Sequence, residues 1–104
     1  MATNTTGRIK YLDAADSGSA IFAAGTSVRL DMVVVVAGSD AARLKLYADA
    51  AATAARLIFD SGNVLADDAE QFIFPSRDDV QPDSTNGLWA VLTGTSPLAW
   101  IWHG

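Results

Sequence analysis

The sequence has 104 residues, of which half are hydrophobic and 18% are charged, with a net charge of −5 and no cysteine. This length suits one domain with a single core, and the composition excludes a disordered chain, a disulfide scaffold and a thiolate metal site. The acidic balance and the shortness of every apolar run argue against nucleic-acid binding and against a membrane-spanning helix.

The first residues, 1–6, are polar and include neither a basic start nor an apolar stretch. They lack the pattern of a secretory signal peptide, so we expect synthesis in a cytoplasm and a flexible arm ahead of the folded domain. The domain is expected to span residues 7–104, because the apolar run that ends at His103 is typical of an integral strand.

Short apolar runs bounded by glycine, serine, aspartate or proline follow the arm, and such runs are typical of strands. The first candidates are residues 8–12 and 20–23, and the strongest is 27–37. Its first half alternates apolar and charged residues, which predicts one buried face. Residues 33–36 are four consecutive valines, which predicts a strand covered on both faces.

Residues 40–62 allow two interpretations. The alanine content, with Asp40 as an N-cap and Gly62 as a stop, favours a helix. The alternation of polar and apolar side chains in residues 43–48 and 56–60 instead favours two strands joined by a loop. On the residues alone we prefer the hairpin and keep the helix as the alternative.

The last part of the sequence predicts three more strands, at residues 71–74, Leu88–Thr93 and Leu98–His103. A polar loop at residues 76–86 precedes the last two, which we expect to form a hairpin. About eight short strands at this spacing indicate an all-β protein. The predicted fold is a single antiparallel β-sandwich, jelly-roll-like in arrangement.

The sequence contains no constellation of residues that indicates catalysis. His103 is the only histidine, and no serine has the surroundings of a nucleophile elbow. Glycine-rich phosphate-binding motifs are missing, and the acidic loops near residues 67–70 and 78–83 lack calcium-loop spacing and fit a solvated surface. We therefore expect no enzyme activity and no cofactor or metal.

Three tryptophans fall close together near the end of the sequence, and Trp100 and Trp102 share one face of their strand. Core packing, an oligomer or partner interface, and a sugar-stacking platform each account for them. The valine run and the last strand are apolar on both faces, which adds to the case for an interface. The candidate subunit or partner contacts are Trp89, Trp100, Trp102, Val33, Val35 and Ile101.

Several segments resemble a recurring pattern of small structural proteins in tailed-bacteriophage particles. The first part is LKLYAD at residues 44–49, where Ala48 precedes the aspartate, followed by ARLI at 55–58. The second part is FIFP at 72–75 and NGLWAVLTGTSP at 86–97, followed by the closing strand. The resemblance extends over about residues 7–104 and favours the hairpin at 40–62.

The resemblance implies a non-enzymatic β-sandwich component of a virion, assembled in the host cytoplasm. Within this class it implies a capsid decoration (cement) protein, a homo-oligomer (trimer or dimer) bound to the major capsid protein or other virion proteins. No nucleic-acid or membrane partner is expected. The alternatives are a tail, baseplate or fibre-base protein and, from another class, a carbohydrate-binding module.

Overall fold

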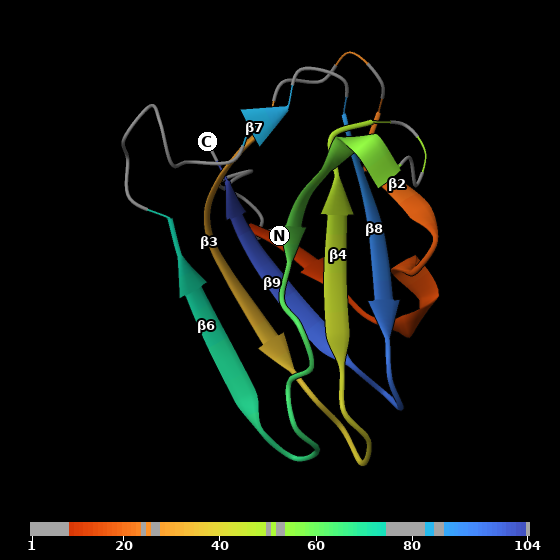
Figure 1. The fold of residues 1–104 in the computed structure, drawn as a ribbon, viewed down its shortest axis with the longest axis vertical. Helices are drawn as coiled ribbons and strands as arrows, with labels where there is room; N and C mark the ends of the chain where they lie inside the picture. The colour runs from red at the N-terminus through yellow and green to blue at the C-terminus, as the bar shows by residue number, and fades with distance from the viewer. Residues whose placement is uncertain are drawn as a thin grey trace.

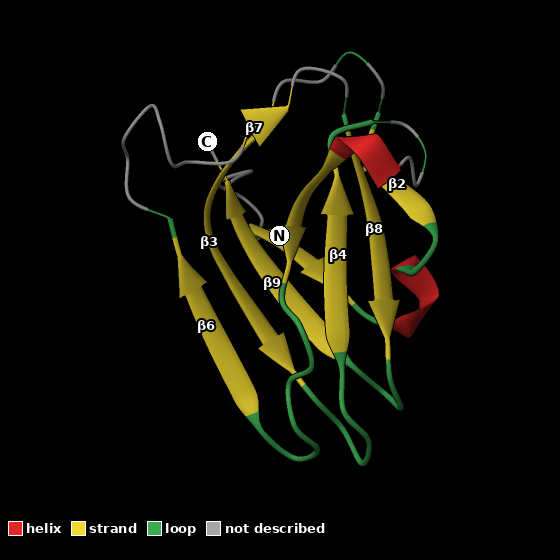
Figure 2. Cartoon of the chain, viewed as in Figure 1, coloured by secondary structure: helices red, strands yellow, loops and turns green. Residues whose placement is uncertain are grey.

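The computed structural model describes residues 9–23, 25, 28–49, 51, 54–74, 83–84 and 87–103. This part of the chain is built from strands and two short 3-10 helices, η1 (Ala14–Asp16) and η2 (Ala54–Arg56), and contains no α-helix (Figure 1, Figure 2). The strands are β1 (Ile9–Leu12), β2 (Ser19–Phe22), β3 (Val28–Val36), β4 (Arg43–Tyr47), β5 (Leu57–Asp60), β6 (Ala69–Ile73), β7 (Asp83–Ser84), β8 (Leu88–Thr93) and β9 (Leu98–His103). The predicted arm, residues 1–6, lies outside the described residues.

The strands form two antiparallel sheets, with the orders β1-β9-β3-β6 and β2-β8-β4-β5, and β7 pairs with the start of β3. Figure 1 shows β6, β3 and β9 side by side in one sheet and β4 beside β8 in the other. Apart from β7, this is the strand order of a jelly roll. The prediction of an antiparallel, jelly-roll-like β-sandwich is therefore confirmed. No described helix is long and apolar enough to cross a membrane.

The segment 40–62, for which the sequence allowed a helix or a hairpin, forms β4 and β5. The two strands pair in antiparallel fashion, with Leu46 opposite Phe59. Along β4 the side chains alternate between half-buried and buried, so that Leu44 and Leu46 face the core. The hairpin prediction is confirmed, because a two-residue period places both leucines on one side of a strand, whereas a helix would turn them to different sides.

The prediction of a final hairpin is wrong, because β8 and β9 belong to different sheets. β8 lies between β2 and β4, and β9 lies between β1 and β3. The four residues that join them cross from one sheet to the other. Gly94 and Ser96 both have positive φ, +128° and +53°, and Pro97 is fully buried. These conformations bend the chain into an arch rather than a tight hairpin turn.

The short strand β7 lies where the sequence predicted a polar loop. Its two residues pair with Val28 and Arg29 at the start of β3. A strand of two residues has no alternation of polar and apolar side chains, so the pattern that identifies longer strands could not reveal it.

The core lies between the two sheets, and three aromatic contacts at two places join the sheets. Phe59 on β5 packs edge-on against Phe72 on β6, with ring centroids 5.1 Å apart, and against Phe74 at 5.5 Å. At the other place, Phe22 on β2 packs against the ring of His103 on β9 at 4.9 Å. The buried core residues are Leu12, Leu30, Val33, Val35, Ala37, Ala42, Leu44, Leu46, Phe59, Val64, Leu88, Ala90, Leu92, Ala99 and Ile101.

Candidate functional site

The outer side of the β1-β9-β3-β6 sheet brings together apolar side chains from all four strands. Directly opposite residues of antiparallel strands point to the same side of a sheet. Trp100 lies opposite Tyr11 on β1 and Val34 on β3, and Val34 lies opposite Gln71 on β6. We call the resulting set the apolar face. Its eleven members are Ile9, Tyr11, Met32, Val34, Val36, Ala69, Gln71, Ile73, Leu98, Trp100 and Trp102.

Every side chain of the apolar face retains contact with solvent. Tyr11 and Ile73, on the two edge strands, are 47% and 67% exposed. Trp100 and Trp102, on a central strand, are half-buried by their neighbours. The inner side of the same sheet is different, since Val33, Val35, Ala99 and Ile101 are fully buried against the second sheet. The sheet is apolar on both sides, but the described chain covers only one of them.

The apolar face carries no charged side chain. Its only amide side chain, Gln71, donates from Nε2 to Met32 Sδ at 2.9 Å, so this group has a partner within the face. Binding sites for ions, nucleotides and nucleic acids require charged or convergent polar groups. A flat, uncharged and apolar surface instead suits contact with another protein surface.

The predicted interface residues on β3 and β9 separate into two groups. Trp100 and Trp102 belong to the apolar face, where a partner could reach them. Val33, Val35 and Ile101 are fully buried in the sandwich core. The prediction that these three contact a partner is therefore corrected, because they have no accessible surface in this fold. Alternation along each strand turns them inward and their neighbours outward.

Trp89, the remaining predicted interface residue, lies on the outer side of the other sheet. It is half-buried and stands opposite Tyr47 on β4 and Ala20 on β2. Its indole Nε1–H is buried and has no acceptor among the described residues. The three tryptophans therefore do not form one surface, although they are close in sequence.

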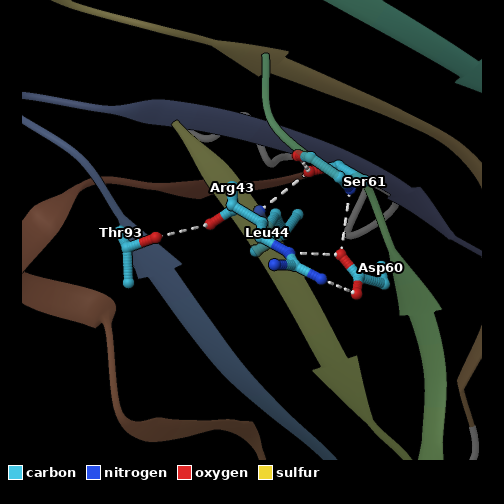
Figure 3. Close-up of polar contacts among 6 residues, drawn as sticks. Arg43, Leu44, Asp60, Ser61 and Thr93 are labelled. Atoms are coloured by element: carbon cyan, nitrogen blue, oxygen red, sulfur yellow. Dashed lines mark hydrogen bonds and ion pairs between the residues drawn. The ribbon is translucent and has the colours of Figure 1, made fainter. Parts of the chain in front are cut away.

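The outer side of the β2-β8-β4-β5 sheet is charged and hydrogen-bonded. Arg43 Nε donates to Asp60 Oδ1 at 2.8 Å, and its Nη2 donates to Asp60 Oδ2 (Figure 3). The backbone N–H of Gly62 also donates to Asp60 Oδ1, at 2.9 Å. These bonds, first from Arg43 and then from Gly62, lower the pKa of Asp60 from 3.8 to about 2. This outer side therefore carries an ion pair, whereas the apolar face has no charged side chain.

The hollows on the described surface include one beside each outer side of the sandwich. One, of about 300 Å³, is beside the apolar face, where Tyr11 and Leu98 line it together with η1 and the β8–β9 arch. The other, of about 210 Å³, is on the charged side and is lined by Arg43, Lys45, Tyr47, Val91 and Thr93. Neither contains the histidine, and neither combines an acid, a base and a nucleophile in the manner of a catalytic site.

The acidic loops weighed as calcium sites receive no support. In the ranges that the structure describes, no three His, Asp or Glu side chains lie together as they would to hold a metal ion. Asp67, Asp68 and Glu70 are exposed, as expected of solvated residues. Asp78 and Asp79 lie outside the described residues.

Most members of the apolar face could not be recognised from the sequence as parts of one surface. Tyr11, Met32 and Ile73 are far apart in the chain and meet only through the order β1-β9-β3-β6. The useful signal was that the strands from 33 to 36 and from 98 to 103 are apolar at consecutive positions. This pattern indicates a sheet with two apolar sides, but it does not show which residues face outward.

No protein-family model matches the chain, and no curated protein is similar to it in sequence. The jelly-roll fold itself serves capsid proteins, lectins and cupins, so the architecture alone does not assign a function. The functional interpretation therefore depends on the apolar face and on the pattern of residues in the sequence.

Proposed function

We propose that this chain is a non-enzymatic structural protein of a bacteriophage particle, and within that class a capsid decoration protein. Its role would be to stabilise the head through protein–protein contacts with the major capsid protein or other virion proteins. No cofactor and no catalytic step enter this proposal.

The apolar face is the observation that carries the proposal. Trp100, Trp102, Tyr11 and Ile73 would all remain in contact with water if the chain acted alone. Soluble monomers rarely expose apolar patches of more than a few hundred Å², and larger patches mark interaction sites. Burying aromatic and aliphatic side chains against another subunit is a common source of binding energy in assemblies.

The resemblance to phage structural proteins also supports the particle assignment. The LKLY segment forms most of β4, and the segment from Gly87 to Pro97 forms β8 and the arch. The FIFP segment contributes Ile73 to the apolar face, and the closing strand contributes Trp100 and Trp102. The sequence pattern thus extends over strands of both sheets and includes part of the apolar face.

Binding to a particle also explains how a small face can give stable attachment. A standard protein interface buries about 800 Å² on each partner, and a 104-residue chain has little surface from which to supply that area. Contacts that are individually weak gain strength when many copies bind one symmetric shell, because each bound copy raises the effective concentration of the next contact.

The test is the composition of phage particles made by cells that carry the gene. Heads and tails are separated, and each fraction is analysed by mass spectrometry for peptides of this chain. We expect the peptides in the head fraction, at a fixed ratio to the major capsid protein. Peptides confined to tails would support the tail or baseplate alternative instead, and their absence from both fractions would contradict a virion role.

A second experiment separates capsid binding from sugar binding. Purified chain is mixed with capsids that lack it, and binding is followed by co-sedimentation, while tryptophan fluorescence is recorded against a panel of glycans. The proposal expects co-sedimentation and no fluorescence change with glycans. A saturable glycan response without capsid binding would favour the carbohydrate-binding module.

A further inference from the structure

The sheet that carries the apolar face has similar residues on its two sides. Its inner side presents Leu30, Val33 and Ile101 to the second sheet, and its outer side presents Val34 and Trp100 to solvent. Antiparallel sheets with one solvated side commonly carry polar residues on that side. The apolar outer side of this sheet departs from that pattern, which favours a covering layer that matches it in shape and charge.

Charge restricts the nature of this layer. The apolar face has no Lys, Arg, Asp or Glu among its eleven side chains, although the whole chain has a net charge of −5. A partner that placed a charge against this face would bury that charge without a counter-ion, which is costly. The best complement is another uncharged apolar sheet face, and this chain itself supplies one. Two copies can meet there without like-charge repulsion.

The area of the apolar face limits how tightly two copies can bind each other. Four strands about 4.8 Å apart and about five residues long, at about 3.4 Å per residue, cover about 300 Å² of sheet plane. Side chains standing off the plane expose more area than this, and the hollow beside Tyr11 and Leu98 extends the surface at one corner. The sheet plane is smaller than the roughly 800 Å² that each partner buries in a standard interface, so we expect a weak contact that forms at high chain concentration.

We propose that a second copy of this chain covers the apolar face, with the two β1-β9-β3-β6 sheets packed face to face. Such sheets pack about 10 Å apart with interdigitated side chains. A two-fold axis would make both copies use the same surface, as in most homodimers. This inference rests on the proposed function in taking the apolar face as the assembly surface, and it names the occupant.

The test uses sedimentation equilibrium over a concentration series from micromolar to millimolar. We expect the wild-type mass to rise from 10.9 kDa to twice that value. Ile73→Glu places a charge on the face at its most exposed large hydrophobic residue and should shift the midpoint of association at least tenfold higher in concentration. Val34→Glu does the same at the centre of the face, and circular dichroism checks that it folds.

Val91→Glu is the matched control. Val91 occupies the corresponding central, outward and half-buried position on β8 in the other sheet, opposite Lys45. The control should associate as the wild type does. A wild type that stays at 10.9 kDa up to millimolar concentration would overturn the inference. So would an Ile73→Glu chain that associates like the wild type.

The same variants distinguish this inference from the proposed function. A monomeric wild type that binds capsids, and loses binding on Ile73→Glu, would show that a capsid subunit covers the face; the function would stand and the inference would fail. If the chain dimerises through the face but is absent from purified particles, the inference would stand and the proposed function would fail.

Discussion

The phenol ring of Tyr11 packs against the indole of Trp100 across the β1–β9 ladder, with centroids 5.2 Å apart and planes tilted by 53°. The contact lies on the outer side of the sheet, where Tyr11 is 47% exposed. It holds the edge strand β1 against the central strand β9 from the solvent side. The pair therefore contributes to the stability of the single chain as well as to the apolar face.

A double-mutant cycle of Tyr11→Ala and Trp100→Ala measures this contact. We expect a coupling of about 0.5–1.5 kcal/mol in the free energy of unfolding, the usual range for aromatic pairs. Urea denaturation at submicromolar chain concentration keeps association out of the measurement. The control cycle pairs Tyr11 with Trp89 on the other sheet, and its coupling should be zero within about 0.5 kcal/mol. Equal couplings in the two cycles would contradict a specific ring contact.

Because of the Arg43–Asp60 pair, we expect the stability of the fold to depend on pH between about pH 4 and pH 2. The pKa of Asp60 is lowered from 3.8 to about 2, chiefly by the hydrogen bond from Arg43. The stabilisation is fully present above the unfolded pKa and is lost as the pH falls through the folded pKa. The effect should be small, because the pair is exposed. Carboxyl NMR titration of Asp60 should give a pKa of about 2.

Arg43→Gln should raise the pKa of Asp60 towards its ordinary value without fully restoring it, since the Gly62 N–H still donates to Asp60. Lys45→Gln is the control, because Lys45 acts on Asp60 only through its charge and as the smallest of the causes. Its effect on the pKa should be the smaller of the two. An Asp60 pKa that is unchanged in Arg43→Gln would show that the hydrogen bonds do not form in solution.

Replacing Gly87 by alanine should cost more stability than its positive φ alone would cause. Its φ is +82°, and a Cβ there would lie 2.5 Å from the carbonyl oxygen of Ala23 and 2.6 Å from that of Phe22. Gly87→Ala should destabilise the fold by about 2–4 kcal/mol, as backbone strain and overlap add. Gly18→Ala is the matched control, with φ +72° and no atom within 4 Å, and should cost about 1–2 kcal/mol. Thermal denaturation compares the two, and equal costs would contradict the close approach.

Two isoleucines on opposite sides of one sheet test the assignment of its faces. Ile101 is fully buried, so Ile101→Ala should cost about 2–5 kcal/mol of unfolding free energy through the cavity it leaves. Ile73 is 67% exposed, so Ile73→Ala should change stability by less than about 0.5 kcal/mol at concentrations where the chain is monomeric. The reverse order would mean that the strand register on this sheet is different.

The sequence predicted the positions of the long strands well, because each carries its own alternation or apolar run. Leu88–Thr93 and Leu98–His103 have the predicted bounds, and the hairpin of β4 and β5 overrides the helix propensity of its alanines. Apart from this hairpin, the sequence did not correctly predict which strands pair with one another. Alternation along β8 and β9 shows which residues share a side of each strand, but not that the two strands enter different sheets.

The candidate site was predicted less completely for the same reason. Trp100 and Trp102 were recognised because two tryptophans two residues apart must share a face. Val33 and Val35 were chosen together with them, since four consecutive valines give no sign of which ones point inward. Only pairing with β6 and β9, at residues far away in the chain, determines that Val34 faces outward.

The order of the strands has a consequence for how the chain can fold during synthesis. β8 and β9 occupy inner positions in their sheets, and all ladders except β3–β6, β3–β7 and β4–β5 include one of them. Both also come after all the other described strands in the order of the chain. Until Leu88–His103 has emerged, β1 and β2 have no partner and neither sheet can close. The sandwich should therefore close only after β8 and β9 have been synthesised, and ribosome-bound chains halted before β8 should be sensitive to protease along their whole length.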